Sequence, residues 1–129
     1  MIENEITQKI IGCAIEVHRE LGPGLLESAY EECLFYVLNQ HQIYTERQKP
    51  MPLLFRGVHL DCGYRLDLFV ERKVIVELKA VEAVNDVHKA QLMTYMKLAK
   101  CKVGLLINFN VVRLKDGIVR NGGAQRETI

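Results

Sequence analysis

Three residues near the middle of the chain have the types and spacing for metal-dependent hydrolysis: Asp67, Glu77 and Lys79. Around each of them polar and apolar residues alternate, which is the two-residue period of a β-strand. Since side chains two apart share a face of a strand, Glu77 and Lys79 should point the same way. The turn decides the rest: a three-residue turn at 71–73 puts Asp67 opposite Glu77, whereas a two-residue turn would put the acids on opposite faces.

Two neighbouring carboxylates on such apolar strands repel each other and are poorly hydrated, and a divalent cation removes both problems. Oxygen ligands in small number, with room for water and a phosphate, suit Mg²⁺ or Mn²⁺. We therefore expect Asp67 and Glu77 to bind the metal, with Lys79 positioning a water or offsetting phosphate charge. The alternative is an exposed edge-strand pair, because Glu-x-Lys alone is common.

Two helical residues extend this set. At 100° per residue, Glu27 falls on the apolar stripe of a helix predicted over residues 25–40. Gln91 takes the centre of the stripe that Val84, Val87, Thr94, Tyr95 and Leu98 form on a helix predicted over 86–100. Both side chains should point inward, toward the acids; taken singly, each could instead be a buried polar residue with a structural partner.

The helices and strands that would position these residues can be predicted from hydrophobic periodicity and from turn residues. A first helix should run from 3 to 21 and stop at Gly22-Pro23-Gly24, and a buried strand at 103–109 should follow the helix over 86–100. The order predicts one α/β domain over residues 1–129, a mixed central sheet flanked by helices. The remaining segments are a meander of strands at 43–48, 52–55, 58–62, 64–70 and 74–80, and a short strand near 118–120.

The composition bears on the cellular location of this domain and on the kind of metal site it could contain. The apolar runs are too short for a membrane span, and Glu3 and Glu5 open the chain where a secretory signal would be basic, so we expect a cytoplasmic protein. The cysteines and histidines lack the close pairs of a zinc site, so a metal should be held by oxygen. We expect Cys13 and Cys33, in helical stretches, to be buried thiols.

The charge is divided unevenly. Residues 1–88 carry 9 Lys and Arg against 14 Asp and Glu, whereas residues 89–129 carry 8 against 2. The basic third of the chain could face a phosphate backbone or be an ordinary solvated surface. Its candidate residues are Lys97, Lys100, Lys102, Arg113, Lys115 and Arg120.

The segment from Gly24 to Tyr30 reads G-x-x-E-x-x-Y, and the chain resembles the GxxExxY proteins, which are placed in the PD-(D/E)XK nuclease superfamily. The likeness extends through residues 11–18, 76–80 and 104–109. It implies a restriction-endonuclease-like core. It also implies that Asp67 is the first acid of the superfamily motif, although Leu66 stands where the motif has proline.

By the same resemblance, Glu77-Leu78-Lys79 is the (D/E)-x-K element and Glu27 matches an acid supplied by a helix before the core. Gln91 and Tyr95 resemble a Q-x-x-x-Y element whose members contact the site or the DNA. The implied catalytic set is Lys79, Asp67, Glu77, Glu27 and Gln91.

Two hypotheses follow. In the first, the protein is a Mg²⁺-dependent nuclease that hydrolyses nucleic acid, with DNA the expected substrate. The metal ligands would be Asp67, Glu77 and the Leu78 carbonyl, with Glu27 completing the shell directly or through water. In the second, the chain is a catalytically silent module that binds nucleic acid or protein. A chain this small could gain DNA reach as a homodimer.

Overall fold

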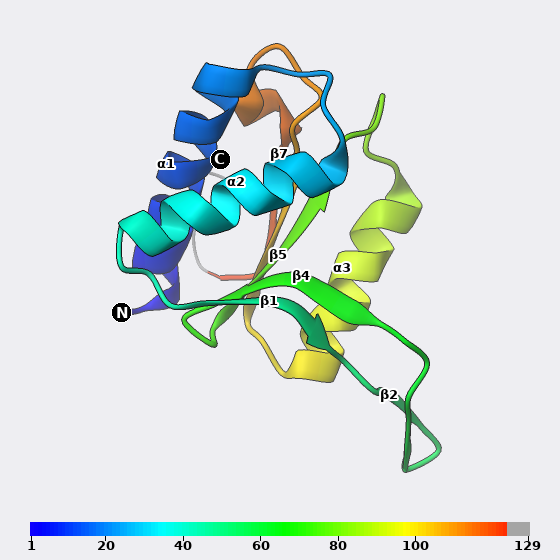
Figure 1. The fold of residues 1–129 in the computed structure, drawn as a ribbon. Helices are drawn as coiled ribbons and strands as arrows, with labels where there is room; N and C mark the ends of the chain where they lie inside the picture. The colour runs from blue at the N-terminus through cyan, green and yellow to red at the C-terminus, as the bar shows by residue number, and fades with distance from the viewer. Residues whose placement is uncertain (124–129) are drawn as a thin grey trace.

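A mixed five-stranded sheet lies at the centre of the molecule, with α1 and α2 on one face and α3 on the other (Figure 1). This computed structural model describes residues 1–123, so the last six residues of the predicted domain lie outside the described residues. The expected α/β class is confirmed. The helices are α1 (Glu3–Leu21), α2 (Glu27–Gln40), α3 (Asp86–Ala99) and a 3-10 helix, η1 (Leu114–Gly117).

The strands of the sheet follow the order β1-β4-β5-β6-β7. Within residues 1–123 only β5 and β6 run parallel, and α3 forms the crossover between them, which agrees with the predicted order of a helix over 86–100 and a strand over 103–109. The strands are β1 (Thr45–Pro50), β4 (Arg65–Val70), β5 (Val74–Lys79), β6 (Val103–Asn108) and β7 (Ile118–Asn121).

The predicted meander is wrong at its second and third strands. β2 (Leu53–Phe55) and β3 (Val58–Leu60) form a separate two-stranded hairpin, and β1 pairs directly with β4. The hairpin extends away from the sheet (Figure 1) and exposes apolar side chains; Phe55, for example, is 54% exposed. Its strands have high β propensity, but propensity does not specify which partner a strand pairs with.

The β4–β5 hairpin has the three-residue turn that the site requires. Val70 pairs with Val74, and Glu71 and Arg72 both adopt φ of 54°, a left-handed conformation that lets three residues reverse the chain. Phe69 and Ile75 pack in the cluster that includes α3 residues. Asp67 and Glu77 are each two residues away from one of these, so their side chains lie on the same face of the sheet.

The corner between α1 and α2 fixes where α2 begins. Gly22 and Gly24 have φ of 67° and 104°, values that favour glycine. The Tyr30 hydroxyl donates to the Gly22 carbonyl (2.6 Å) and accepts the Leu25 N–H (3.1 Å). The Tyr30 ring stacks on Phe109, with centroids 4.5 Å apart. The first turn of α2 is thereby held against the end of the sheet.

Of the helices among residues 1–123, none combines the length and apolar character that crossing a membrane requires.

Candidate active site

The two acids lie where β4 and β5 stop pairing. The paired register ends at Leu68 and Val76, one step short of Asp67 and Glu77. Beyond it, carboxylates take the place of backbone carbonyls: the Asp67 N–H donates to Glu77 Oε2 (2.9 Å), and the Leu78 N–H donates to Asp67 Oδ2 (2.8 Å). Each acid is thus fixed by the backbone of the opposite strand, and the two carboxylates occupy one gap between the strands.

These crossed hydrogen bonds use one oxygen of each carboxylate. Within residues 1–123, no hydrogen bond reaches Asp67 Oδ1 or Glu77 Oε1. The N–H and C=O of a strand residue lie on the same edge, so the Leu78 carbonyl also faces the β4 side. Two carboxylate oxygens and one carbonyl oxygen are therefore available at the gap.

The surroundings of Asp67 and Glu77 disfavour the ionised form of both carboxyl groups. Burial raises the pKa of Glu77, which is 4% exposed, to about 8, and the charge of Asp67 adds to the rise. Burial also raises the pKa of Asp67 to about 6; the Leu78 N–H opposes this, while Glu31 and Glu27 reinforce it. Without a cation, ionising both carboxyl groups at once is therefore unfavourable in the folded protein.

Lys79 ends β5 beside the acids and is half-buried. Its charge lowers the pKa of Glu27, Asp67 and Glu77 against the larger effect of burial. No direct ion pair joins Lys79 to an acid of the described chain. The ammonium group is therefore close enough to act on the site and is not neutralised by a single partner.

The prediction that Glu27 is buried on the apolar stripe of α2 is wrong, although its charge raises the pKa of both Asp67 and Glu77 and it therefore lies near them. Glu27 is the first residue of α2 and is exposed, although partial burial still raises its pKa and Lys79 acts on it. The buried acid of α2 is Glu31, one turn further on and 7% exposed. Sequence reasoning missed Glu31, yet a signal existed: it precedes Leu34 by three residues and Leu38 by seven.

Glu31 is held by two residues of β1. Arg47 Nε donates to Glu31 Oε2 (2.9 Å), and Gln48 Nε2 donates to Glu31 Oε1 (2.8 Å). A second nitrogen of Arg47 lies 2.7 Å from Glu32. Since the charge of Glu31 raises the pKa of Asp67, this network adds negative potential at the candidate site.

The predicted stripe of α3 is confirmed at Val84, Tyr95 and Leu98, which pack in the cluster beneath the helix, and is wrong at Val87 and Thr94. Val87 is 74% exposed and Thr94 is exposed, whereas the buried residues of α3 are Leu92 and Tyr95. Gln91 consequently lies at the margin of the inward face, half-buried. Its Nε2 donates to the Tyr95 hydroxyl (3.2 Å). After burial, the charge of Glu77 contributes most to raising the pKa of Tyr95, so this pair lies close to the acids.

The basic residues of the C-terminal third are mostly exposed. Arg120 is the exception: it is half-buried and donates to Thr7 and Asn4 of α1. That arginine is occupied within the fold.

Comparison with known proteins gave one match. The family model described as the PD-(D/E)XK nuclease superfamily matches residues 4–121 of this chain. No curated protein and no solved structure matched.

Proposed function

The chain belongs to the PD-(D/E)XK nuclease superfamily, and from this membership we propose that it is a Mg²⁺- or Mn²⁺-dependent nuclease. We propose that residues 1–129 form one catalytic domain. Its substrate would be nucleic acid, with DNA the expected kind. The observation that carries the proposal is the pair of carboxylates crossed between β4 and β5, Asp67 and Glu77, with Lys79 beside them.

The donor set fits a hard divalent cation. Asp67 Oδ1, Glu77 Oε1 and the Leu78 carbonyl are oxygen ligands of the kind that Mg²⁺ prefers, and the cation would offset the burial and the neighbouring negative charges that raise both pKa values. Such an ion supplies Lewis acidity, acidifying a water and offsetting phosphate charge. Glu27, exposed at the start of α2, would complete the shell through a water.

The protein's own groups orient the reaction. Lys79, which has no ion-pair partner in residues 1–123, would donate a hydrogen bond to the attacking water and align it with the phosphorus. The Gln91 amide and the Tyr95 hydroxyl, which are already hydrogen-bonded to each other, would contact the substrate from α3. Their hydrogen bond fixes both side chains before substrate arrives.

Two linked measurements test the proposal. Isothermal titration with Mg²⁺ and Mn²⁺ should show binding to the wild type and none to Asp67→Ala. A cleavage screen should then cover single- and double-stranded DNA and RNA, with free ends and as closed circles. Mg²⁺ or Mn²⁺ should support cleavage and Ca²⁺ should not, because Ca²⁺ accepts looser coordination and acidifies water less.

Either half can contradict the proposal. Absence of binding at millimolar metal would mean that the acids are structural. Demonstrated metal binding without cleavage of any substrate would favour the catalytically silent binding module. Equal binding in Asp67→Ala would place the metal elsewhere.

A further inference from the structure

A second cluster of metal-ligating side chains lies away from the acids, at the junction of α1 with the end of α2. Cys13 and Glu16 come from α1, and His41 follows the last residue of α2. One ligand atom from each of the three lies within 4.8 Å of the other two. The closest pair is His41 Nε2 and Glu16 Oε2, which are 2.9 Å apart.

The backbone holds the three residues in place. Cys13 and Glu16 are three apart on one helix and therefore share a face. His41 is fixed by its own N–H, which donates to the Val37 carbonyl (3.1 Å), and the next turn is closed by Ile43 N–H to Leu38 O (3.0 Å). Two ligand positions thus lie on α1, and the third lies in the hydrogen-bonded turn that ends α2.

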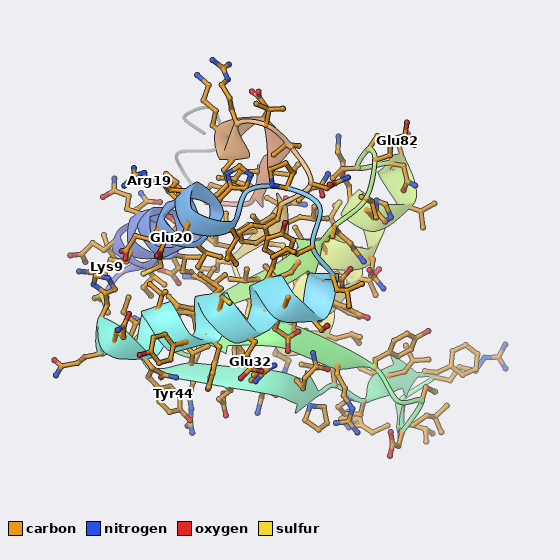
Figure 2. All side chains as sticks on the ribbon, turned by 45° about the horizontal axis from the view of Figure 1, so that its top comes forward. Lys9, Arg19, Glu20, Glu32, Tyr44 and Glu82 are labelled. Atoms are coloured by element: carbon orange, nitrogen blue, oxygen red, sulfur yellow. The ribbon has the colours of Figure 1, made fainter. Side chains whose placement is uncertain are left out.

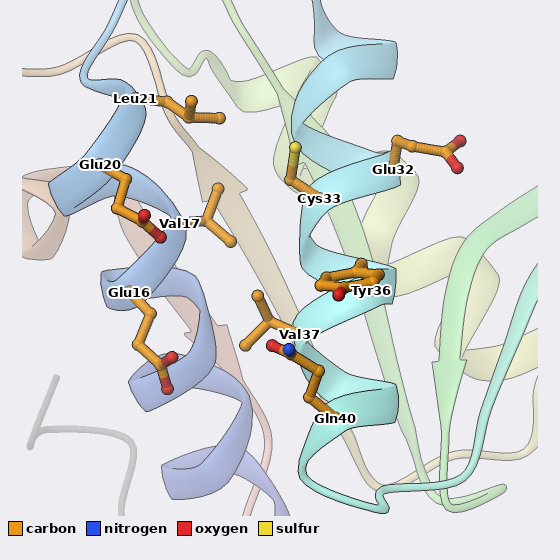
Figure 3. A pocket seen from close by; sticks show the side chains of 9 residues that line it. All are labelled: Glu16, Val17, Glu20, Leu21, Glu32, Cys33, Tyr36, Val37 and Gln40. Carbon is orange, nitrogen blue, oxygen red and sulfur yellow. The ribbon is translucent and has the colours of Figure 1, made fainter.

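The cluster has space for an ion and a further ligand. Its members line a hollow of about 260 Å³, which Gly12 also lines. A Cβ built on Gly12 would meet no atom within 4 Å, so the region above the cluster is open. Glu16 also lines the neighbouring groove between the two helices, where it faces across from Gln40, the residue before His41 (Figure 3).

The chemistry differs from that of the acid pair. A thiolate, an imidazole and one carboxylate form a sulfur, nitrogen and oxygen donor set, which suits Zn²⁺ and similar borderline ions, whereas Mg²⁺ prefers oxygen alone. Three protein ligands and one water would complete a tetrahedron. Two negative ligands and a neutral imidazole also balance the charge of a divalent cation.

Metal binding at this cluster would release the proton of the Cys13 thiol. Burial and the charge of Glu16 raise the pKa of the Cys13 thiol to about 11, while Lys9 acts in the opposite direction. Binding therefore displaces the thiol proton to solvent as the sulfur–metal bond forms. His41 binds through an unprotonated Nε2, so its contact with Glu16 is replaced by two bonds to one ion.

We propose that Cys13, Glu16 and His41 form a Zn²⁺ site that fastens the end of α2 to α1. The site is independent of the nuclease proposal, because it shares no residue with the acid pair. Cys13 and His41 are 28 residues apart in the sequence, so only the fold brings them together.

Cobalt spectroscopy tests the site directly. Co²⁺ added to the reduced protein should give a thiolate-to-metal charge-transfer band, which the oxygen ligands of the acid pair cannot produce. Cys13→Ser should abolish the band. His41→Ala, a change at an exposed residue that should not disturb folding, should weaken Zn²⁺ affinity by more than roughly 100-fold, since loss even of an outer partner costs 10–100-fold.

Matched controls separate this site from the other thiols. Cys62→Ser and His59→Ala alter an exposed cysteine and an exposed histidine near the β2–β3 hairpin, and both variants should keep the band and the affinity. Zn²⁺ should raise the melting temperature of the wild type and leave that of His41→Ala unchanged. A band that persists in Cys13→Ser, or equal Zn²⁺ affinity in His41→Ala and the wild type, would overturn the proposal, whatever the outcome of the nuclease tests.

Discussion

Replacing Glu77 by glutamine should stabilise the metal-free protein at alkaline pH. The folded state raises the pKa of Glu77 from 4.5 to about 8, so between these values the folded protein holds a proton that the unfolded chain has lost. The free energy of unfolding must then fall as the pH rises through this window. Glutamine resembles the protonated acid and can still accept the Asp67 N–H, so the variant should not show this fall.

The size of the effect follows from the same shift. At 1.36 kcal/mol per pKa unit, the full rise corresponds to an upper bound of about 5 kcal/mol. Because water can enter the strand gap once the acid is charged, we expect roughly half of this, about 2 kcal/mol at pH 8.5, and almost no difference at pH 4, below the ordinary pKa of the carboxyl group.

Urea unfolding of metal-free wild type and Glu77→Gln at several pH values measures the effect. Glu20→Gln, at an exposed acid of α1 that lines the groove between α1 and α2 (Figures 2 and 3), is the control and should be neutral throughout. A Glu77→Gln protein that is less stable than the wild type at pH 8.5 would show that the charged carboxylate has a stabilising partner, and would refute the reasoning.

Three further variants test the supporting structure by urea unfolding. Tyr30→Phe removes a hydroxyl with two backbone partners and should cost about 1–3 kcal/mol; an unchanged stability would mean that the corner between α1 and α2 does not depend on it. Gly104→Ala places a Cβ 2.8 Å from Leu92 Cδ1 and should cost about 1–3 kcal/mol by pushing α3 from the sheet; wild-type stability would show that Leu92 moves freely. Arg47→Ala leaves the buried Glu31 without its ion-pair partner and should cost about 3 kcal/mol, part of which Glu31→Gln in the same chain should restore; no rescue would mean that arginine acts through packing.

From the sequence, a three-residue turn put Asp67 and Glu77 on one face and a two-residue turn remained the alternative; the signals for both are local, and the three-residue turn is the one formed. The alternation around Asp67 and Glu77 and the three residues of the turn at 71–73 determine which side chains share a face. The helix from 3 to 21 was equally accessible, because Gly22-Pro23-Gly24 ends it sharply.

The remaining features depend on contacts between distant segments. Helical period alone could not show that Glu27 is exposed at the first residue of α2, or that Arg47, 16 residues after Glu31, is the ion-pair partner of that buried acid. The β2–β3 hairpin was misplaced because strand propensity does not name a partner. Likewise, sequence spacing could not show that Cys13 and His41, 28 residues apart, lie beside each other in the fold.

The most direct test of the nuclease proposal is the cleavage rate of Lys79→Ala at saturating Mg²⁺, on the best substrate of the wild type. Lysine is not a ligand, so the variant should bind metal as the wild type does, while its rate should fall by roughly 10²–10⁴-fold. Lys9→Ala, at an exposed residue of α1 (Figure 2) that lines the hollow beside Cys13 and, within residues 1–123, shares no contact with the acid pair, should cleave at the wild-type rate. Equal rates in Lys79→Ala and the wild type would contradict the account, because hydrolysis would then arise from another site or from a contaminating nuclease.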